Sequence, residues 1–235
     1  MSSTPDPKYC LIIPAYNEER RIVSFFDTTN GFEGELIVVC DGTDATAEVV
    51  EQIAHQRNDL VIRCLRFKER LGKGGGIIAG LAVARAPLVG YVDADGSTSI
   101  DELTRLFSLL GPYDGVFGSR WVLGSKLQVQ QGLLRQLESR GFNLFIRILF
   151  GLRYRDTQCG AKVFKKASID LILPKMISRG FEFDVELLWR LSEAGFKIGE
   201  FPIEWQNIGD SRVKWRDIIR MLTGLIRIRL HADSP

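Results

Sequence analysis

The sequence lacks a long hydrophobic run. Its most apolar late stretch, Gly141–Leu152, has twelve residues and contains Arg147, whereas a helix that spans a membrane needs about 20 apolar residues. The polar stretch Met1–Lys8 also lacks the basic and then apolar pattern of a signal peptide. The sequence therefore predicts a protein that is soluble or lies on a membrane surface.

The chain also lacks a large excess of charge of one sign. It has 31 basic and 29 acidic residues, which gives a formal charge of +2, whereas a dedicated nucleic-acid-binding domain is usually strongly basic. We therefore expect no nucleic-acid partner. With 235 residues, 45% of them hydrophobic, the chain is long enough to form one large globular domain over residues 1–235.

Cysteine is scarce, and its spacing matches neither a zinc site nor a small disulfide scaffold. The four cysteines are about 30, 24 and 95 residues apart, and three lie in apolar runs typical of buried strands; they are Cys10, Cys40, Cys64 and Cys159. We therefore expect reduced thiols and a cytoplasmic location.

Short apolar runs alternate with longer helical patterns in the first half of the chain. This alternation predicts β-α-β units, and hence an α/β fold with a mainly parallel sheet flanked by helices. The expected strands are Tyr9–Ile13, Leu36–Cys40, Val61–Leu65 and Leu88–Val92, and the expected helices are Glu19–Thr29, Thr43–Gln56, Gly75–Arg85 and Ile100–Leu110. In such folds ligands bind beyond the carboxyl ends of the strands.

The second half of the chain is richer in helical patterns. Amphipathic helices are expected at Leu134–Leu152, Glu182–Ala194 and Lys214–Leu230. The first has a broader apolar stripe than one core contact requires, and the last carries one lysine and four arginines. Such helices can adsorb to an anionic membrane. Alternatively, they pack on the core or on a second subunit, as in a homodimer.

Two carboxylates are the sharpest local feature. Asp93 and Asp95 follow the fourth apolar run directly. Carboxylates one residue apart at a strand end can bind one hard cation and leave coordination positions for phosphate oxygens and water. The alternative is a simple turn that caps the next helix, because Asp-Gly-Ser-Thr is also turn chemistry.

A glycine cluster, Gly72–Gly76, contains Lys73 and leads into an apolar helix. Glycines let the backbone approach a ligand closely, and a helix N-terminus with a lysine suits phosphate. The spacing does not match a P-loop, and a glycine-rich turn that binds nothing is the alternative.

Other candidate residues fall at strand ends or among the arginines of the second half. An aromatic ring at Tyr16 and carboxylates at Glu18 and Asp41 suit a base and a ribose. Guanidinium groups bind phosphate with two donors at once and do not titrate. The candidate arginines are Arg120, Arg135, Arg140 and Arg212.

Six motifs in a fixed order resemble the family-two glycosyltransferases of GT-A fold, which implies a Rossmann-like fold with a mixed, mainly parallel sheet. The chain looks most like their polyprenyl-phosphate, or dolichyl-phosphate, branch, and the resemblance runs from about Tyr9 to Val213. The motifs are Ile12–Glu18, Val38–Thr43, Gly72–Gly75, Val92–Asp95, Gly118–Arg120 and Asp156–Gly160.

The resemblance implies an inverting enzyme that moves a sugar from a nucleotide-diphosphate sugar, with UDP expected, to dolichyl or polyprenyl phosphate. A nucleotide-binding half, about residues 8–110, would precede an acceptor and membrane-facing half, about 111–235. The C-terminal amphipathic helices would lie at the interface with the membrane, so that the protein is peripheral on the inner, cytoplasmic membrane face.

The resemblance also assigns roles to residues. Asp93 and Asp95 would bind Mg²⁺ or Mn²⁺ and would be catalytic, together with Arg120 and Arg135. The nucleotide pocket would be lined by Pro14, Tyr16, Glu18, Asp41, Lys73 and Asp93. The acceptor phosphate would be bound by Arg120 and Arg135, with Arg140 and Arg212 as weaker candidates.

Two departures from the family pattern affect the choice of sugar and donor contacts. Cys40 replaces the first of two aspartates before a glycine, and Ser97 replaces a glutamine of the mannose-transferring relatives. The segment Asp156–Gly160 looks closer to that of the dolichyl-phosphate glucose synthases, and this resemblance implies glucose, or N-acetylglucosamine, in preference to mannose.

Three alternatives remain open at this point. A polysaccharide or other hydroxyl acceptor would need a carboxylate base, for which Asp156 or Glu182 is available. A sugar nucleotidyltransferase would share the nucleotide half and the metal carboxylates, but its glycine-rich signature after the first strand is missing. A non-catalytic sensor of nucleotide sugars is the third.

Overall fold

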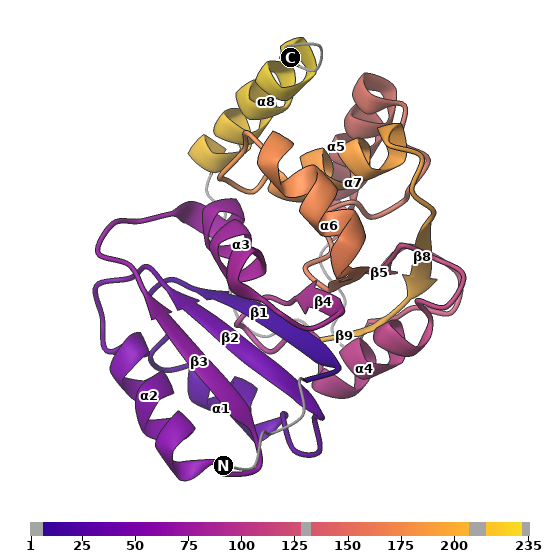
Figure 1. Cartoon of the computed structure of the whole chain (residues 1–235). Helices are drawn as coiled ribbons and strands as arrows, with labels where there is room; N and C mark the ends of the chain where they lie inside the picture. Colours follow the sequence, from indigo (N-terminus) through magenta and orange to yellow (C-terminus); the bar gives the residue numbers. More distant parts are fainter. Residues whose placement is uncertain (1–6, 128–132, 207–214, 232–235) are drawn as a thin grey trace.

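A computed structural model of the chain describes residues 7–127, 133–206 and 215–231, with the side chains of 133–140 and 215–217 left out. Its main sheet has seven strands in the order β3-β2-β1-β4-β7-β5-β8 (Figure 1). These strands are β1 (Tyr9–Ala15), β2 (Gly34–Cys40), β3 (Val61–Arg66), β4 (Leu88–Tyr91), β5 (Gly115–Ser119), β7 (Lys162–Lys165) and β8 (Ile198–Pro202). A small second sheet pairs β6 (Lys126–Leu127) with β9 (Glu204–Trp205).

The main sheet is mixed and mainly parallel, as predicted. Strands β1 to β4 run parallel to one another, and so do β5 and β8. Only β7 among these strands runs antiparallel, to both β4 and β5. All four predicted strands form. A continuous apolar run suits a strand that is buried on both faces, as in β2, where every residue is buried. The strand β3 lies at the edge of the sheet, and its residues are exposed or partly exposed.

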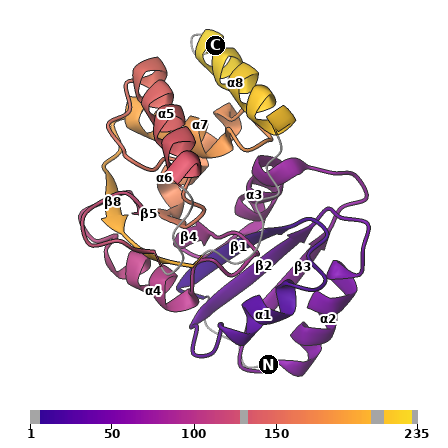
Figure 2. The same cartoon turned by 180° about the vertical axis from the view of Figure 1, so that it is seen from behind.

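Helices cover both faces of the sheet (Figures 1 and 2). One face carries α1 (Ile22–Asp27), α2 (Thr46–Gln56) and α4 (Ile100–Ser108). The other face carries α3 (Gly72–Val83), α6 (Lys166–Ile172) followed by a 3₁₀ turn at Leu173–Lys175, and α7 (Phe183–Glu193). Two further helices, α5 (Leu133–Phe150) and α8 (Trp215–Leu230), share a third apolar cluster with α7.

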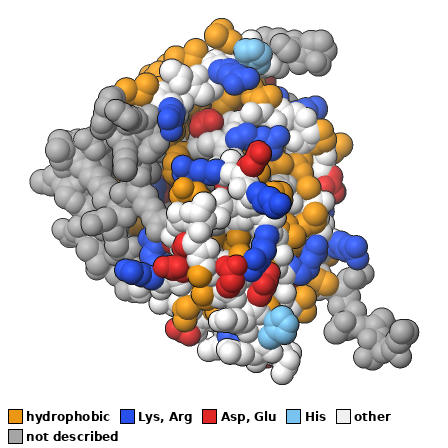
Figure 3. All heavy atoms as spheres, turned by 90° about the vertical axis from the view of Figure 1, so that its left-hand side faces the viewer, with side chains coloured by type: hydrophobic (Ala, Val, Ile, Leu, Met, Phe, Trp, Pro, Cys, Tyr) orange, Lys and Arg blue, Asp and Glu red, His pale blue; other side chains and the backbone are white. Residues whose placement is uncertain are grey.

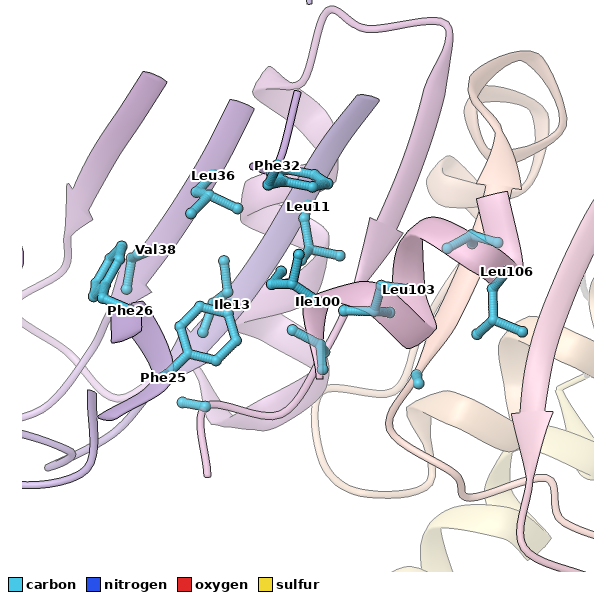
Figure 4. Packing of buried hydrophobic residues seen from close by; sticks show 14 of the residues in the cluster. Leu11, Ile13, Phe25, Phe26, Phe32, Leu36, Val38, Ile100, Leu103 and Leu106 are labelled. Carbon is cyan, nitrogen blue, oxygen red and sulfur yellow. The ribbon is translucent and has the colours of Figure 1, made fainter. Parts of the chain in front are cut away.

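The core beneath α1 and α4 fixes the first strands in place. Phe25 of α1 and Leu103 of α4 have no exposed surface and belong to one apolar cluster with Leu11 and Ile13 of β1 (Figure 4). Burying a side chain of this size contributes about 1.5–3 kcal/mol. The sheet is therefore a rigid base for the loops that follow its strands.

The structure corrects the interpretation of α7. The helix forms within one residue of its predicted bounds, but it is not amphipathic with a polar face in solvent. The carboxylates of Asp184 and Glu186 are buried, as are the apolar residues beside them. Within the described residues, no helix has both the length and the apolar character that crossing a membrane requires.

Candidate active site

The candidate site lies where β1, β2 and β4 end, because these parallel neighbours deliver their following loops to one edge of the sheet. The first two loops are tied together by Asn17, whose Oδ1 accepts hydrogen bonds from the backbone N–H groups of Thr43 (2.8 Å) and Asp44 (3.3 Å). Asn17 has φ of 55°, a left-handed conformation that asparagine tolerates better than most residues. A Cβ at Gly42 would lie 2.4 Å from this oxygen, so the close approach of the loops requires glycine there.

The carboxylate of Asp41 joins this loop pair to the start of α3. Its Oδ2 accepts hydrogen bonds from the backbone N–H groups of Leu71 (2.8 Å) and Gly72 (3.1 Å), and the residue is only 7% exposed. Asp41 thus orders the backbone that precedes Lys73, in addition to any contact with a nucleotide.

The other predicted nucleotide-binding residues have partners of their own in this structure. Glu18 is buried, and its carboxylate accepts two hydrogen bonds from the guanidinium of Arg21, at 2.7 and 2.8 Å. The ring of Tyr16 is half-buried, with the guanidinium of Arg70 4.1 Å from its centroid. Pro14 packs close to α3, since a Cβ at Gly76 would lie 3.4 Å from its Cβ.

The glycine cluster forms the first turn of α3, which begins at Gly72 rather than at the predicted Gly75. A Cβ at Gly72 would lie 2.6 Å from the carbonyl oxygen of Arg179, and one at Gly74 would lie 2.6 Å from the Cβ of Phe183. The N–H of Gly75 donates to the same Arg179 oxygen at 3.1 Å. These glycines therefore allow α3 to pack closely against the segment before α7.

Lys73 extends from this turn to Asp93. Its Nζ lies 2.9 Å from Oδ1 of Asp93 and 3.3 Å from Oδ2 of Asp184. Burial alone would lower the pKa of Lys73, but the two carboxylates outweigh this effect and hold the pKa above its ordinary value. Lys73 is therefore a fixed positive charge beside Asp93.

Asp95 forms a turn, as one of the two interpretations predicts. Its Oδ1 accepts a hydrogen bond from the N–H of Ser97 at 2.9 Å. The helix α4 that follows is capped by Ser99, whose side chain accepts from the N–H of Glu102 at 3.3 Å. The cap therefore does not need Asp95, and its carboxylate is half-exposed.

The two carboxylates fit a hard divalent cation. The side chain of Asp93 is 40% exposed, and carboxylate oxygens are the ligands that Mg²⁺ and Mn²⁺ prefer. Across the described residues, no group of three or more His, Cys, Asp or Glu side chains is arranged to hold a metal. Asp93 and Asp95 stay the two predicted protein ligands of such an ion.

The segment Asp156–Gly160 brings Arg120 and Asp93 together. At one end, Asp156 accepts hydrogen bonds from Nε (2.7 Å), Nη2 (2.9 Å) and the backbone N–H (2.9 Å) of Arg120. At the other end, Gly160 lies so close to Asp93 that a Cβ there would be 2.0 Å from Oδ2. One short segment thus contacts the predicted phosphate-binding arginine and the predicted metal-binding carboxylate.

The ion pair between Arg120 and Asp156 excludes one role that the sequence left open. Asp156 has no exposed surface and is bonded to Arg120, so it is not available as a general base. Arg120 keeps its charge, because the Asp156 carboxylate outweighs the effect of burial and raises the pKa of the guanidinium. Its Cζ lies 5.5 Å from the ring centroid of Trp205.

Glu182 and three arginines are the remaining predicted residues. Oε1 of Glu182 accepts from the N–H of Gly180 at 3.3 Å, and its side chain packs against Gly224 of α8. Arg135 and Arg140 lie in α5, but their side chains are outside the described part of the chain, and Arg212 is outside the described residues altogether.

Sequence reasoning missed a buried network behind Lys73. Asp184 accepts hydrogen bonds on Oδ1 from the hydroxyl of Tyr91 and from Nζ of Lys162, both at 2.6 Å. Burial raises the pKa of Asp184, but Lys162 and Lys73 lower the pKa by more, so that it lies below its ordinary value. One sequence signal was available, since Asp184 and Glu186 alternate with apolar residues, and that alternation does not give a helix one polar face.

Comparisons with known proteins agree with this geometry. Residues 10–172 match the profile of the family described as glycosyl transferase family 2. The chain is 33% identical to the dolichyl-phosphate beta-glucosyltransferase ALG5C of Trichomonas vaginalis, over 94% of this chain and 70% of that protein. It is 30% identical to the dolichyl-phosphate beta-glucosyltransferase of Dictyostelium discoideum, over 93% of this chain and 73% of that protein.

Solved structures share the fold at lower sequence identity. Glucosyl-3-phosphoglycerate synthase from Mycobacterium tuberculosis, solved with Mg²⁺ and UDP, superposes with a TM-score of 0.67 at 18% identity, over 96% of this chain and 79% of that one. A mannosyltransferase from Pyrobaculum calidifontis, solved with GDP-mannose and Mn²⁺, gives a TM-score of 0.66 at 19% identity, over 96% and 67% of the two chains. With the GT-A fold and a family match over more than half of its length, the chain belongs to glycosyl transferase family 2.

Proposed function

We propose that this glycosyltransferase transfers glucose from UDP-glucose to dolichyl phosphate or a similar polyprenyl phosphate, with inversion at the anomeric carbon. The observation that carries the proposal is the segment Asp156–Gly160, which contacts both Arg120 and Asp93. A cation for the acceptor phosphate and a carboxylate for the donor diphosphate are the two groups that such a reaction needs side by side. The similarity to dolichyl-phosphate beta-glucosyltransferases along nearly the whole chain supports glucose and the lipid acceptor.

In the proposed reaction an oxygen of the lipid phosphate attacks C1 of the glucose. The bond between C1 and the oxygen of UDP breaks, and UDP departs with the bonding electrons. A phosphate monoester is largely dianionic near neutral pH, since its second pKa is about 6, so the nucleophile needs no strong base. This agrees with the buried, ion-paired state of Asp156.

On the donor side, Asp93, Asp95 and Lys73 are assigned to the diphosphate. Bound at Asp93 and Asp95, Mg²⁺ or Mn²⁺ would act as a Lewis acid and stabilise the departing diphosphate. The positive charge of Lys73, whose Nζ lies 2.9 Å from Asp93, would stabilise the negative charge on the diphosphate oxygens as well. Pro14, Tyr16, Glu18 and Asp41 are assigned to the nucleoside, a role supported by their place at the ends of β1 and β2.

On the acceptor side, Arg120 is assigned to the lipid phosphate. A guanidinium has five N–H donors, and two of them bind Asp156, which fixes the plane of the group. The proposal gives the other donors to the phosphate, which they would hold in line behind C1. We still predict that the acceptor phosphate is also bound by Arg135, Arg140 and Arg212.

A lipid acceptor also requires contact with a bilayer, and we assign this to α5 and α8. One side of each helix packs on the core through residues such as Ile146 and Leu225. Other apolar residues of both helices are exposed, and exposed arginines accompany them; these are Leu144, Phe145, Ile148, Ile218, Ile219, Ile226 and Leu230 with Arg147, Arg220, Arg227 and Arg229. Basic and hydrophobic side chains also lie next to one another near the C-terminal end of the chain in the upper part of Figure 3.

This mixture of charge and apolar area fits an anionic membrane surface. The exposed apolar residues show that packing on the core does not use up the apolar faces of the two helices. We therefore propose that the protein adsorbs to the cytoplasmic face of a membrane.

The test is transfer from labelled UDP-glucose, UDP-N-acetylglucosamine and GDP-mannose to a short-chain polyprenyl phosphate with Mn²⁺. We expect a lipid-extractable product from UDP-glucose, lost in Asp95→Asn and kept in the matched control Asp101→Asn, which changes an exposed carboxylate of α4. Mn²⁺-dependent binding of UDP without a lipid product from any donor would contradict the proposed acceptor.

A further inference from the structure

Asp184 lies at the centre of a buried network that links four elements of the fold. Its carboxylate contacts Tyr91 of β4, Lys162 of β7 and Lys73 of α3, while Asp184 itself is in the first turn of α7. The side chains of Lys162 and Asp184 are 0% and 2% exposed. Contacts of this kind hold a carboxylate in one place, because each partner comes from a different, well-packed element.

The charges of the network balance only when Asp93 is counted. Two lysines, Lys73 and Lys162, face two carboxylates, and Lys73 bridges them at 2.9 Å from Asp93 and 3.3 Å from Asp184. Asp93 is 40% exposed, whereas Asp184 is 2% exposed. The inner carboxylate therefore stays with the lysines, and the outer one is accessible to a ligand.

A lysine side chain loses about 1.5–2 kcal/mol of rotamer freedom when it is fixed, so its position depends on its partners. If Asp93 were the only anionic partner of Lys73, the lysine would lose its ion pair whenever Asp93 bound a metal ion. With Asp184 behind it, the ammonium keeps a buried partner and stays in place.

We propose that Asp184 is a positioning residue for the donor. It holds the ammonium of Lys73 beside Asp93, so that Asp93 can bind the metal ion of the donor while Lys73 stays aligned with the diphosphate oxygens. The proposal rests on the proposed function only in that Lys73 and Asp93 bind the donor diphosphate. Asp184 contacts neither substrate nor reacting atoms in this account and acts through Lys73.

The test is a double-mutant cycle measured by binding, with UDP and Mn²⁺ titrated into the full chain by calorimetry. We expect Asp184→Asn to weaken UDP binding about tenfold, and to have less than about a twofold effect when Lys73→Met is already present, because coupled residues do not act additively. Equal effects of Asp184→Asn in both backgrounds, or no effect in either, would overturn the proposal.

Two control variants separate positioning from structural support. Tyr91→Phe and Lys162→Met remove the other partners of Asp184 and disturb the same buried network, but they leave Lys73 with its carboxylates. We expect both to bind UDP within about twofold of the wild type. If Lys162→Met weakens UDP binding as much as Asp184→Asn does, the role of Asp184 is structural and the proposal is wrong.

Removal of Asp184 alone leaves Lys162 buried without its carboxylate, which can prevent folding. If Asp184→Asn does not fold, Asp184→Asn combined with Lys162→Met takes its place in the cycle, since this pair leaves no unpaired charge at Lys162. A second readout is steady-state kinetics, in which the KM for the donor should rise and the KM for the acceptor should stay unchanged. Because UDP binding needs no acceptor, failure of the lipid-phosphate proposal and failure of this one are distinguishable.

Discussion

At the scale of single residues, the site depends on two close contacts that only particular residues permit, one between Gly160 and Asp93 and one between Asp156 and Arg120. Gly160 lets the carboxylate of Asp93 lie against the backbone of the segment that begins with Asp156. Asp156 in turn fixes the orientation of Arg120 through three hydrogen bonds. The same short segment therefore sets the positions of Asp93, which we propose for the donor, and of Arg120, which we propose for the acceptor. Substitutions at its two ends should affect donor binding and acceptor binding separately.

Gly160→Ala tests the first of these contacts. Its Cβ would lie 2.0 Å from Oδ2 of Asp93, so the carboxylate must rotate away, which changes metal binding more than the fold. We expect Mn²⁺-dependent binding of UDP to weaken about tenfold or more, while the free energy of unfolding changes by less than about 1 kcal/mol. The control is Gly111→Ala, where a Cβ meets nothing within 4 Å. Unchanged Mn²⁺ affinity in Gly160→Ala would show that Asp93 is not a ligand.

Asp156→Asn tests the second contact. The substitution keeps the shape but removes the anion that pairs with the largely buried Arg120, and breaking a buried pair costs about 3–5 kcal/mol. We expect the free energy of unfolding, measured by urea denaturation, to fall by about 3 kcal/mol, and the KM for the lipid acceptor to rise. Glu48→Gln at the exposed pair with Arg66 is the control, and it should cost less than about 1 kcal/mol. A stable variant with a normal KM for the acceptor would show that Arg120 does not bind the acceptor.

At the scale of elements, the sequence was informative where periodicity and burial agree. Apolar runs identified β1 to β4, and the Asp-x-Asp and glycine motifs lie at the sheet edge where the parallel topology predicts them. The strands β5, β7 and β8 were not predicted. In β7, Lys162 reads as polar, but it is buried and pairs with Asp184, 22 residues later. The network behind Lys73 could not be predicted for the same reason, since it depends on contacts between four separate elements.

Within α7, Glu186 has a role that the pattern also concealed. Its carboxylate has no exposed surface and accepts hydrogen bonds from Nε of Arg190 (2.7 Å) and from the backbone N–H groups of Ile177 and Ser178, the latter at 2.8 Å. The chain then continues to Arg179, whose carbonyl accepts from Gly75 of α3. The helix α7 thus supports α3 through the backbone as well as through Asp184.

We expect Glu186→Gln to lower the free energy of unfolding by about 2–3 kcal/mol, because hydrogen bonds to a charged acceptor are worth about 1.5–3 kcal/mol. Amide hydrogen exchange should become faster at Ile177, Ser178 and Gly75 together. The matched control is Glu193→Gln at the exposed end of the same helix, which should alter neither quantity. Faster exchange at Ile177 and Ser178 with none at Gly75 would contradict the proposed support of α3.

At the scale of the whole molecule, the chain separates two kinds of surface. The carboxyl ends of β1, β2 and β4 carry the residues proposed to bind the donor, and the helices α5 and α8 carry exposed apolar residues with arginines. The net charge of only +2 means that attraction to an anionic bilayer must come from this local group of arginines and not from the molecule as a whole. The two surfaces are linked through Asn143 of α5, which pairs with Thr157 in the segment that orients Arg120.

The membrane assignment predicts that apolar and basic contributions can be separated by vesicle binding. Ile148 and Ile226 are 76% and 48% exposed on α5 and α8 and lie outside the buried cluster of these helices, so replacing both with serine should cost little core packing. We expect this double variant to bind phosphatidylserine-containing vesicles about tenfold more weakly than the wild type, and binding of the wild type to fall as salt rises, since the arginines are screened. Leu171→Ser, at a residue 63% exposed on α6, is the control and should bind normally. If the double variant binds vesicles as the wild type does but sediments as a smaller species, the two helices form a contact between subunits and the membrane assignment is wrong.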